Sequence, residues 1–290
     1  MALRYLELID RVTAPLPPMP VATLGSPAFQ PIGKPLERCT VMLLNSAGVH
    51  FRHDPPFKPV NDLSFRRLAE VADPTLLRPS HPSPIRRPGR IDVNVVYPYE
   101  RLRELADLGV IAAATAWHLS MLGAVKMLVA LVEDVGPAIA HDARAAGADL
   151  LFLIPLCPAC HQAFAVLART IERCGVPTVA ITGARDITER VRPPRSLFLD
   201  FPLGNAVGRP LDPDGQRRIC RTVLEGAVSI QTPGEIRDLG EVWPEPHWEA
   251  AVVAQYEAEA EIVRRQRSSE FDEAGNLLAA LEVERVASLI

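Results

Sequence analysis

Two cysteines and a histidine within five positions carry the clearest chemical signal of this 290-residue chain. Cys157, Cys160 and His161 lie in the segment LFLIPLCPACHQAF, where an apolar, strand-like run leads directly into a helical pattern. Both thiols therefore lie at a predicted helix start, where free N–H groups and the helix dipole favour a thiolate. The segment predicts thiol redox chemistry or thiol nucleophilic catalysis.

Metal binding and simple packing are the alternatives for this cysteine pair. A structural zinc site usually combines two such pairs, and the other cysteines, Cys39, Cys174 and Cys220, are isolated in the sequence. His161 or His118 would complete a metal site only if the fold brought it to the pair. The sequence analysis therefore assigns no metal ligands.

Polar residues on other segments are candidates for substrate binding. Ser46 and His50 follow the first predicted strand, which would bring them to the same sheet edge as the cysteine pair. His81 lies in the rigid segment PSHPSP and would act as an acid or base if a tertiary neighbour were in reach. His118 precedes a Met-Leu-Gly turn, and Asn205 lies in a Gly-flanked loop that suits close backbone approach. For His50 and His118, the structural alternatives are a turn histidine and a buried core histidine.

The elements that must position these residues alternate along the chain. Strands followed by helices imply right-handed crossovers and a mainly parallel sheet, so we expect a doubly wound α/β fold. The pattern predicts strands over residues 39–45, 90–97, 149–155, 177–182 and 196–200, and helices over 98–108, 158–174, 184–191 and 213–226. A further helix is expected over residues 124–146, interrupted at Gly136 and Pro137.

Three regions are expected along the chain. Residues 1–37 contain seven prolines and predict a short helix followed by an extended N-terminal arm. Residues 38–230 form the predicted α/β catalytic domain, either as one unit or as two halves, 38–125 and 126–230. Within it, residues 50–90 form a long, irregular, proline-rich excursion. Residues 231–290 form a helical extension whose apolar stripe is expected to dock on the body or on a second copy, so a homo-oligomer is expected.

Composition narrows the classes of function. The formal net charge is −4, without the clustered basic face that a nucleic-acid-binding protein needs. The longest apolar stretch, residues 110–132, contains His118, Gly123 and Lys126 and indicates a core segment rather than a membrane span. Five cysteines, an odd and sparse set, suit a reducing cytoplasm. No signal peptide, phosphate loop or dinucleotide fingerprint is evident, so we expect a cytoplasmic protein that acts on a small molecule.

Four segments, in their order along the chain, resemble the selenoprotein B family of glycine, sarcosine, betaine and D-proline reductases. The resemblance is closest to the small, thiol-bearing subunit type of D-proline reductase, and it covers about residues 39–227. The segments are VMLLNSAGVHFRHDPPF at 41–57, RIDVNVVYPYERLRELADLGVI at 90–111, LIPLCPACHQAFAVLARTIERCGVPTVAIT at 153–182 and FLDFPLGNAVGRP at 198–210.

The resemblance implies roles for the cysteine pair. Family members commonly carry selenocysteine at the position of Cys157, so Cys157 would be the nucleophile and Cys160 the resolving thiol. A free thiol ionises less readily than a selenol, and the helix start together with a protonated His161 would favour the thiolate. Thiol–disulfide exchange would release a Cys157–Cys160 disulfide, which an external dithiol, such as a thioredoxin-like protein, would reduce. Whether selenocysteine replaces Cys157 in the native protein stays open, and no bound cofactor is predicted.

The predicted function is a thiol-dependent reductase that cleaves a C–N, C–S or C–Se bond of a small amino-acid-like substrate. In the family, a pyruvoyl group on a separate subunit holds the substrate amine, so a partner subunit of that kind is expected unless the substrate needs no Schiff base. The alternatives are a cysteine-dependent hydrolase or desulfurising enzyme of the same fold, and a non-catalytic subunit that binds a metal or a partner.

Overall fold

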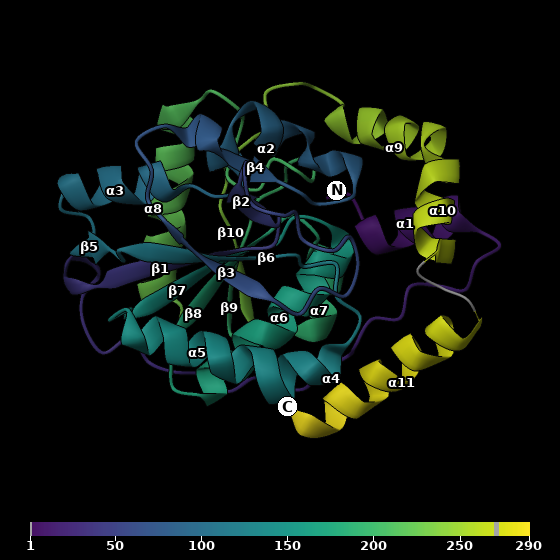
Figure 1. The fold of residues 1–290 in the computed structure, drawn as a ribbon, viewed down its shortest axis with the longest axis horizontal. Helices are drawn as coiled ribbons and strands as arrows, with labels where there is room; N and C mark the ends of the chain where they lie inside the picture. Colours follow the sequence, from purple (N-terminus) through teal and green to yellow (C-terminus); the bar gives the residue numbers. More distant parts are fainter. Residues whose placement is uncertain (1, 270–272) are drawn as a thin grey trace.

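Short apolar runs form the strands of one mainly parallel sheet. The computed structural model describes residues 2–269 and 273–290 (Figure 1). In this part of the chain the strand order is β10-β9-β8-β7-β1-β6-β3, with β5 also pairing with β1, and β3 is antiparallel to β6. The strands are β1 (Thr40–Asn45), β3 (Phe65–Ala69), β5 (Ala113–Ala114), β6 (Trp117–Met121), β7 (Leu150–Ile154), β8 (Thr178–Thr182), β9 (Arg195–Phe198) and β10 (Glu235–Asp238).

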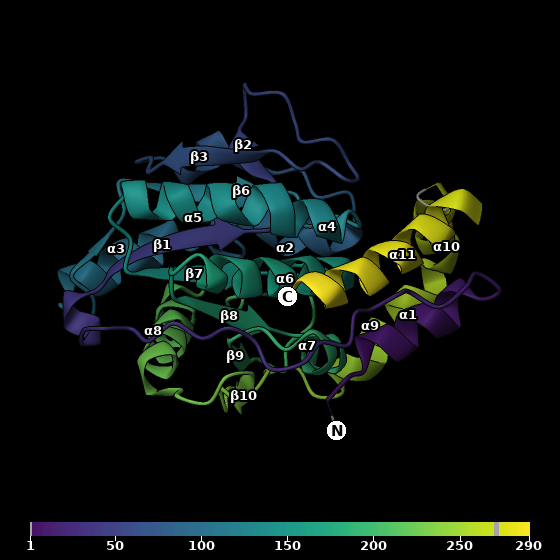
Figure 2. The same ribbon diagram turned by 90° about the horizontal axis from the view of Figure 1, so that it is seen from below.

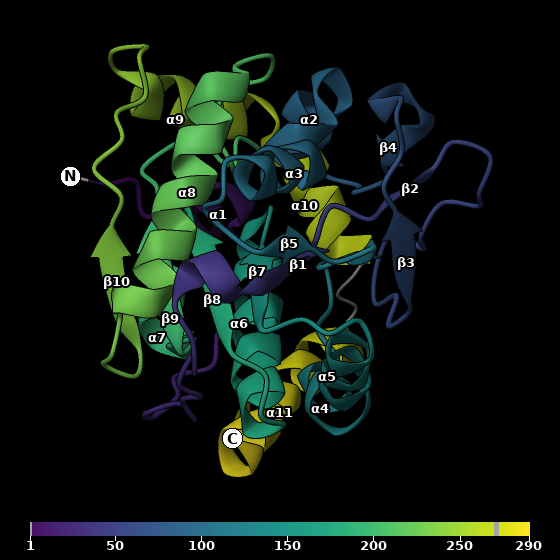
Figure 3. The same ribbon diagram turned by 90° about the vertical axis from the view of Figure 1, so that its left-hand side faces the viewer.

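Helices cover both faces of this sheet because its strands are apolar on both sides. In β1, Val41 and Leu43 belong to one buried core, while Met42 and Leu44 belong to the other. The first core includes α3 (Tyr99–Asp107) and α8 (Pro213–Ser229). The second includes α5 (Gly136–Ala145), α6 (Pro158–Arg173) and α7 (Arg185–Val191), on the other side of the sheet in Figure 3. The predicted doubly wound α/β fold is confirmed.

The predicted strand over residues 90–97 is wrong. The segment contains the end of α2 (Arg87–Ile91) and a 3₁₀ turn, Val93–Val95. The Asp92 side chain accepts a hydrogen bond from the Asn94 amide at 3.0 Å, and such a local cap competes with strand pairing. Val93 and Val95 of this segment are buried in the 3₁₀ turn instead of a sheet.

The predicted interruption of the helix at Gly136 and Pro137 is also wrong, because the irregular turn lies just before these residues. A π-helical turn, Leu131–Val135, joins α4 (Leu128–Ala130) to α5 without a break. The wider turn accommodates the missing N–H of Pro137. A side chain at Gly136 would place its Cβ 2.6 Å from Thr170 Cγ2, so glycine allows α5 to pack closely on α6.

The long excursion after β1 is more regular than the sequence indicates. It forms a two-stranded antiparallel ribbon from β2 (Val49–Phe51) and β4 (Leu77–Pro79), and it also supplies the edge strand β3. Strand β6 went unpredicted because its buried positions include the polar residues His118 and Ser120. The sheet therefore extends beyond β1 through two strands that local periodicity does not indicate.

The two ends of the chain pack together beside the carboxyl edge of the sheet. Helix α1 (Tyr5–Thr13) lies next to α9 (Trp248–Ala258) and α10 (Ala260–Ser269), while α11 (Glu273–Leu289) lies along α4 (Figure 2). The Val286 side chain of α11 is buried in the core that contains α5 and α6. In the described ranges the tail is helical from Trp248 onward and packs on its own body. The helical extension expected over residues 231–290 starts later than predicted, because Glu235–Asp238 form strand β10 of the sheet. No helix in the described ranges is long and apolar enough to cross a bilayer.

Candidate active site

The cysteine pair lies where β7 ends and α6 begins. Pro158 occupies the first position of α6, where a missing N–H costs nothing, and Cys157 is the N-cap residue. The Cys160 amide donates a hydrogen bond to Cys157 Sγ at 3.2 Å. The two sulfur atoms are 2.9 Å apart, well beyond the bonded distance of about 2.05 Å, and both cysteines are free. The two sulfurs are therefore in contact without a bond between them.

His81 reaches the pair from a distant segment of the chain. Backbone hydrogen bonds from Ser80 to the Gly48 carbonyl and from His81 to the Ala47 carbonyl, each 3.1 Å, hold this segment beside the end of β1. His81 Nε2 lies 3.4 Å from Cys160 Sγ, and His81 Nδ1 accepts a hydrogen bond from the Ser83 amide at 3.2 Å. Because Nδ1 accepts a hydrogen bond, the proton of a neutral imidazole ring must be on Nε2. His81 is therefore oriented to donate to the sulfur of Cys160.

Ser46 and Gly123 complete the wall around Cys160. Ser46 Oγ accepts a hydrogen bond from the Leu156 amide at 2.7 Å, and the Ser46 side chain is also hydrogen-bonded to Cys160. A Cβ atom at Gly123 would lie 2.8 Å from Cys160 Sγ, so only glycine fits this position without displacement. The predicted site residues Ser46 and His81 thus meet the cysteine pair.

The surroundings of Cys160 stabilise its thiolate. Burial alone would raise the pKa of this fully buried thiol. Hydrogen bonds with Cys157, His81 and Ser46 outweigh burial and hold the pKa of Cys160 well below its usual value. Because the two thiols are in contact and share a proton, they titrate as a pair rather than as separate groups.

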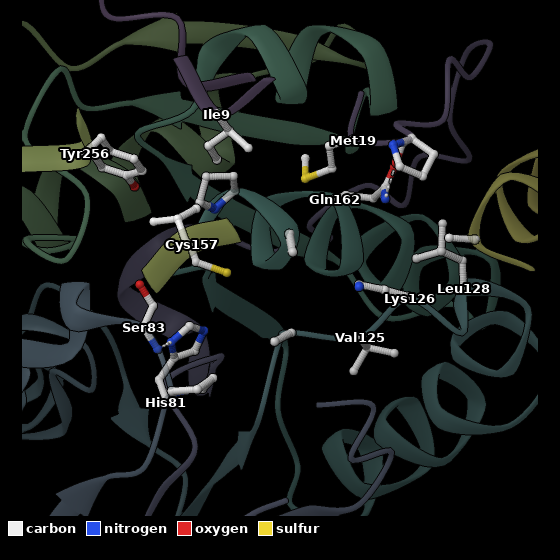
Figure 4. A pocket seen from close by; sticks show the side chains of 17 residues that line it. Ile9, Met19, His81, Ser83, Val125, Lys126, Leu128, Cys157, Gln162 and Tyr256 are labelled. Atoms are coloured by element: carbon white, nitrogen blue, oxygen red, sulfur yellow. Dashed lines mark hydrogen bonds between the residues drawn. The ribbon is translucent and has the colours of Figure 1, made fainter. Parts of the chain in front are cut away.

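Cys157 opens onto a cavity of about 130 Å³ (Figure 4). The side chain of Cys157 is 7% exposed, whereas Cys160 behind it is fully buried. Figure 4 shows the Cys157 sulfur and the Lys126 amino group pointing into the same open space. Most of the lining is apolar. Part of it comes from α1, the N-terminal arm and the three C-terminal helices, through Ile9, Met19, Pro20, Tyr256, Val263 and Ala279.

Four polar residues of this cavity, Ser83, Lys126, Gln162 and Tyr256, were not predicted from the sequence. Gln162 directly follows His161, and Lys126 follows the Gly123 turn, so these positions were the only local signals. Tyr256 comes from α9, far along the chain, and no local pattern connects it with the cysteines. Burial raises the pKa of Tyr256, and the neighbouring Tyr5 and Cys157 raise it further. Its hydroxyl therefore stays protonated and able to donate.

The expectation of a protonated His161 is wrong. His161 Nδ1 donates to the Cys157 carbonyl at 2.8 Å, and Nε2 accepts a hydrogen bond from the Gly183 amide at 3.1 Å. These partners fix a neutral ring, and burial lowers the pKa of His161 to about 4. His161 therefore positions the backbone of Cys157 and supplies no positive charge to the thiols.

Three other predicted site residues lie outside this cavity. His118 is fully buried on β6, where Nδ1 accepts from the Leu43 amide at 3.2 Å and burial lowers its pKa to about 3. Asn205 lines a separate small cavity with Pro155, and its side chain donates to the Pro202 carbonyl at 3.1 Å. His50 faces a different cleft, next to the site. His118 is thus a buried core histidine, which was the structural alternative for this residue.

The same cluster meets the distance requirement of a metal site. In the described part of the chain, the donor atoms of His81, Cys157 and Cys160 lie within 4.8 Å of one another. Two thiolates and an imidazole suit a soft metal ion such as Zn²⁺. However, a metal-bound histidine normally donates its other N–H to an acceptor. His81 instead accepts the Ser83 amide at Nδ1, so Nε2 carries a proton and does not fit a metal ligand.

Comparisons with known proteins identify relatives of this chain. It is 29% identical over 229 residues to the gamma subunit of D-proline reductase from Acetoanaerobium sticklandii, covering 79% of this chain and 92% of the relative. This chain is related to the selenoprotein B family. A second relative is the gamma subunit of glycine reductase complex component B from Carboxydothermus hydrogenoformans. It is 28% identical over 144 residues, which cover 49% of this chain and 32% of that relative.

The names of the two relatives indicate the general type of role that this chain has. Both are components of amino-acid reductases by name, which supports an oxidoreductase-type role and is consistent with partner subunits. No protein-family model matches the chain, and no solved structure matches it.

Proposed function

We propose that this chain is a thiol-dependent reductase subunit in which Cys157 attacks a small substrate and Cys160 resolves the intermediate. The observation that carries the proposal is the arrangement of the two sulfurs. Cys157 borders the cavity, while Cys160 lies behind it at 2.9 Å with its thiolate stabilised by His81. A nucleophile at the surface of a cavity and a buried partner in contact is the geometry that a two-thiol reduction needs.

The first step forms a bond from Cys157 Sγ to a substrate carbon and breaks the bond from that carbon to its leaving group. The proton of the Cys157 thiol passes to Cys160 across the 2.9 Å contact or to the leaving group. Tyr256, which lines the same cavity with a protonated hydroxyl, is placed to donate to a departing amine, thiol or selenol.

The second step forms the Cys157–Cys160 disulfide. Cys160 Sγ attacks Cys157 Sγ, the bond from sulfur to the substrate carbon breaks, and that carbon leaves with the electron pair and takes up a proton. Both thiol hydrogens thus end on the two products, and the cysteines are oxidised by two electrons. An external dithiol then reduces the disulfide by exchange, which requires a reducing compartment.

This chemistry and the cavity restrict the substrate. A carbon that departs with an electron pair must be stabilised, as it is next to a carboxyl, carbonyl or iminium group. The cavity, about 130 Å³, admits only a small molecule, and its walls are largely apolar. Besides Cys157, the polar residues of the lining are His81, Ser83, Lys126, Gln162 and Tyr256. Lys126 suits a carboxylate on the substrate. A small amino-acid-like compound with a C–N, C–S or C–Se bond meets these requirements.

The two named relatives are subunits of larger assemblies, and we extend that arrangement to this chain. No cofactor of its own is required by the steps above, because the two thiols carry both electrons. A partner subunit would activate the substrate amine, for which a pyruvoyl group is the family's solution, and a thioredoxin-like dithiol would regenerate the pair.

Selective alkylation tests the proposal without knowledge of the substrate. Native protein is treated with limiting iodoacetamide, and the modified cysteines are identified by peptide mass spectrometry. We expect Cys157 to react first, ahead of Cys39 and Cys220, whose pKa values burial raises. Cys174 is the matched control, because it is more exposed than Cys157 and lies outside the site. Faster labelling of Cys174 than of Cys157 would contradict the proposal.

A further inference from the structure

A second cavity, of about 300 Å³, lies next to the thiol cavity. His81 and Pro82 line both cavities. Four arginines and two histidines line the second one, with a single carboxylate among its lining residues, that of Asp54. We call this cavity the arginine cleft, and its cationic side chains are Arg52, Arg78, Arg86 and Arg90.

The positive charge of the arginine cleft is only partly balanced, since one carboxylate lies among four arginines. Arg78 and Arg90 form no ion pair and no side-chain hydrogen bond with any residue in the described ranges. Arg86 donates only to backbone carbonyls, including that of Ser83 at 3.0 Å. Burial lowers the pKa of Arg86, and the neighbouring Arg90, Arg87 and Arg78 lower it further, as expected for like charges held together. The chain as a whole has a net charge of −4, so this concentration of cations is local.

Secondary structure holds these cations in place. Arg78 of β4 is the register partner of His50 in the adjacent strand β2. Arg86 precedes α2 and Arg90 lies in its last turn. Helix α2 is held against the body at Gly89, where an added Cβ would lie 2.8 Å from Val96 Cγ2. The guanidinium groups therefore come from two braced elements rather than from a mobile loop.

We propose that the arginine cleft binds an oxyanion, a carboxylate or phosphate group of a small molecule, in the cavity that shares His81 with the cysteine pair. A guanidinium presents parallel N–H donors that match the two oxygens of such groups. An anion bound among several unpaired cations also removes their mutual repulsion. The cleft would thus hold the charged group of a ligand beside the catalytic thiols.

Calorimetric titration of the full chain tests this site, with inorganic phosphate and succinate as separate probes at constant low ionic strength. We expect saturable binding of at least one probe, and the tighter probe identifies the oxyanion class. Arg78→Gln combined with Arg90→Gln should weaken binding by about tenfold or more. Arg78→Lys keeps the charge but loses the paired donors, so its affinity should lie between those of wild type and the double variant.

Two controls make the result specific. Arg221→Gln removes an exposed arginine of α8, far from the cleft in sequence and paired with Glu225, and should leave anion binding unchanged. Cys157→Ser should also bind the anion like wild type, so the cleft is tested independently of the thiol mechanism. Absence of saturable binding of both probes, or equal affinity in the double variant and wild type, would overturn the proposal.

Discussion

His81 is the residue whose removal should change the thiol site most measurably. Its Nε2 lies 3.4 Å from Cys160 Sγ, and the Ser83 amide fixes Nε2 as the protonated nitrogen. A hydrogen bond to a charged group contributes about 1.5–3 kcal/mol. Since one pKa unit corresponds to about 1.4 kcal/mol, His81→Ala should raise the pKa of Cys160 by about one to two units. The long sulfur contact places the expected shift at the lower end of this range.

Ultraviolet absorbance of the thiolate, followed against pH, measures this shift. The titration of each protein is compared with that of its Cys160→Ser counterpart, so that the other cysteines cancel. His53→Ala is the matched control, because His53 is exposed and lies outside the thiol cavity. His81→Gln keeps an N–H donor and should recover part of the shift. An unchanged midpoint in His81→Ala would refute the role assigned to His81.

Four further outcomes follow from the site. Gly123→Ala should destabilise the protein by about 1–3 kcal/mol in denaturant titrations, because the new Cβ meets Ser46 and Cys160; full stability with an unchanged Cys160 titration would contradict the packing argument. Tyr256→Phe should lower substrate turnover by about a hundredfold while leaving Cys157 alkylation by a neutral reagent unchanged, and normal turnover would remove Tyr256 as the proton donor. Deleting residues 248–290 should speed alkylation of Cys157 and lower the melting temperature, because this tail lines the cavity and buries Val286; an unchanged labelling rate would show that the tail does not shield the site. Since the pKa of Cys160 is depressed in the folded state, its stabilisation should be fully present above the unfolded thiol value of about 8.5 and be lost as pH falls through the folded value. The difference in unfolding free energy between wild type and Cys160→Ser should therefore shrink on acidification, and a difference that stayed constant would contradict the thiolate assignment.

The local part of the site was predictable because its signals lie within one segment. An apolar run, a proline and a helical pattern around Cys157 are sufficient to place both thiols at a helix start. The alternation of strands and helices likewise predicts the four central parallel strands, β1, β7, β8 and β9. These features depend on neighbours in sequence, which periodicity and helix-capping preferences describe directly.

The choice of histidine could not be made from local sequence. His161 is adjacent to Cys160, yet on a helix its side chain reaches back to the Cys157 carbonyl one turn earlier. His81 lies about eighty positions away in sequence and reaches the thiols only because β4 and its following turn pair with the segment after β1. Tertiary hydrogen bonds, rather than sequence proximity, decide which imidazole contacts the sulfur.

The residues that cover the cavity could also not be predicted from local sequence patterns. The helical tail was expected to dock, but its own periodicity does not specify the surface on which it packs. Tyr256 and Val263 become cavity residues only because α9 and α10 pack on α1 beside the start of α6. Strand β6 was missed for a related reason, since His118 and Ser120 are buried polar residues that form hydrogen bonds with Leu43 and Asn45 of the adjacent strand β1.

Reaction with an aromatic disulfide reagent tests the two thiol roles most directly. Cys157 should attack the reagent and release one aromatic thiolate, after which Cys160 should displace the second and leave an intramolecular disulfide detectable by mass. In Cys160→Ser, the account predicts release of a single thiolate and a stable mixed disulfide on Cys157. Cys157→Ser should react slowly at this site. A mixed disulfide that persists on wild-type Cys157, or rapid attack by Cys160 in Cys157→Ser, would contradict the assignment of nucleophile and resolving thiol.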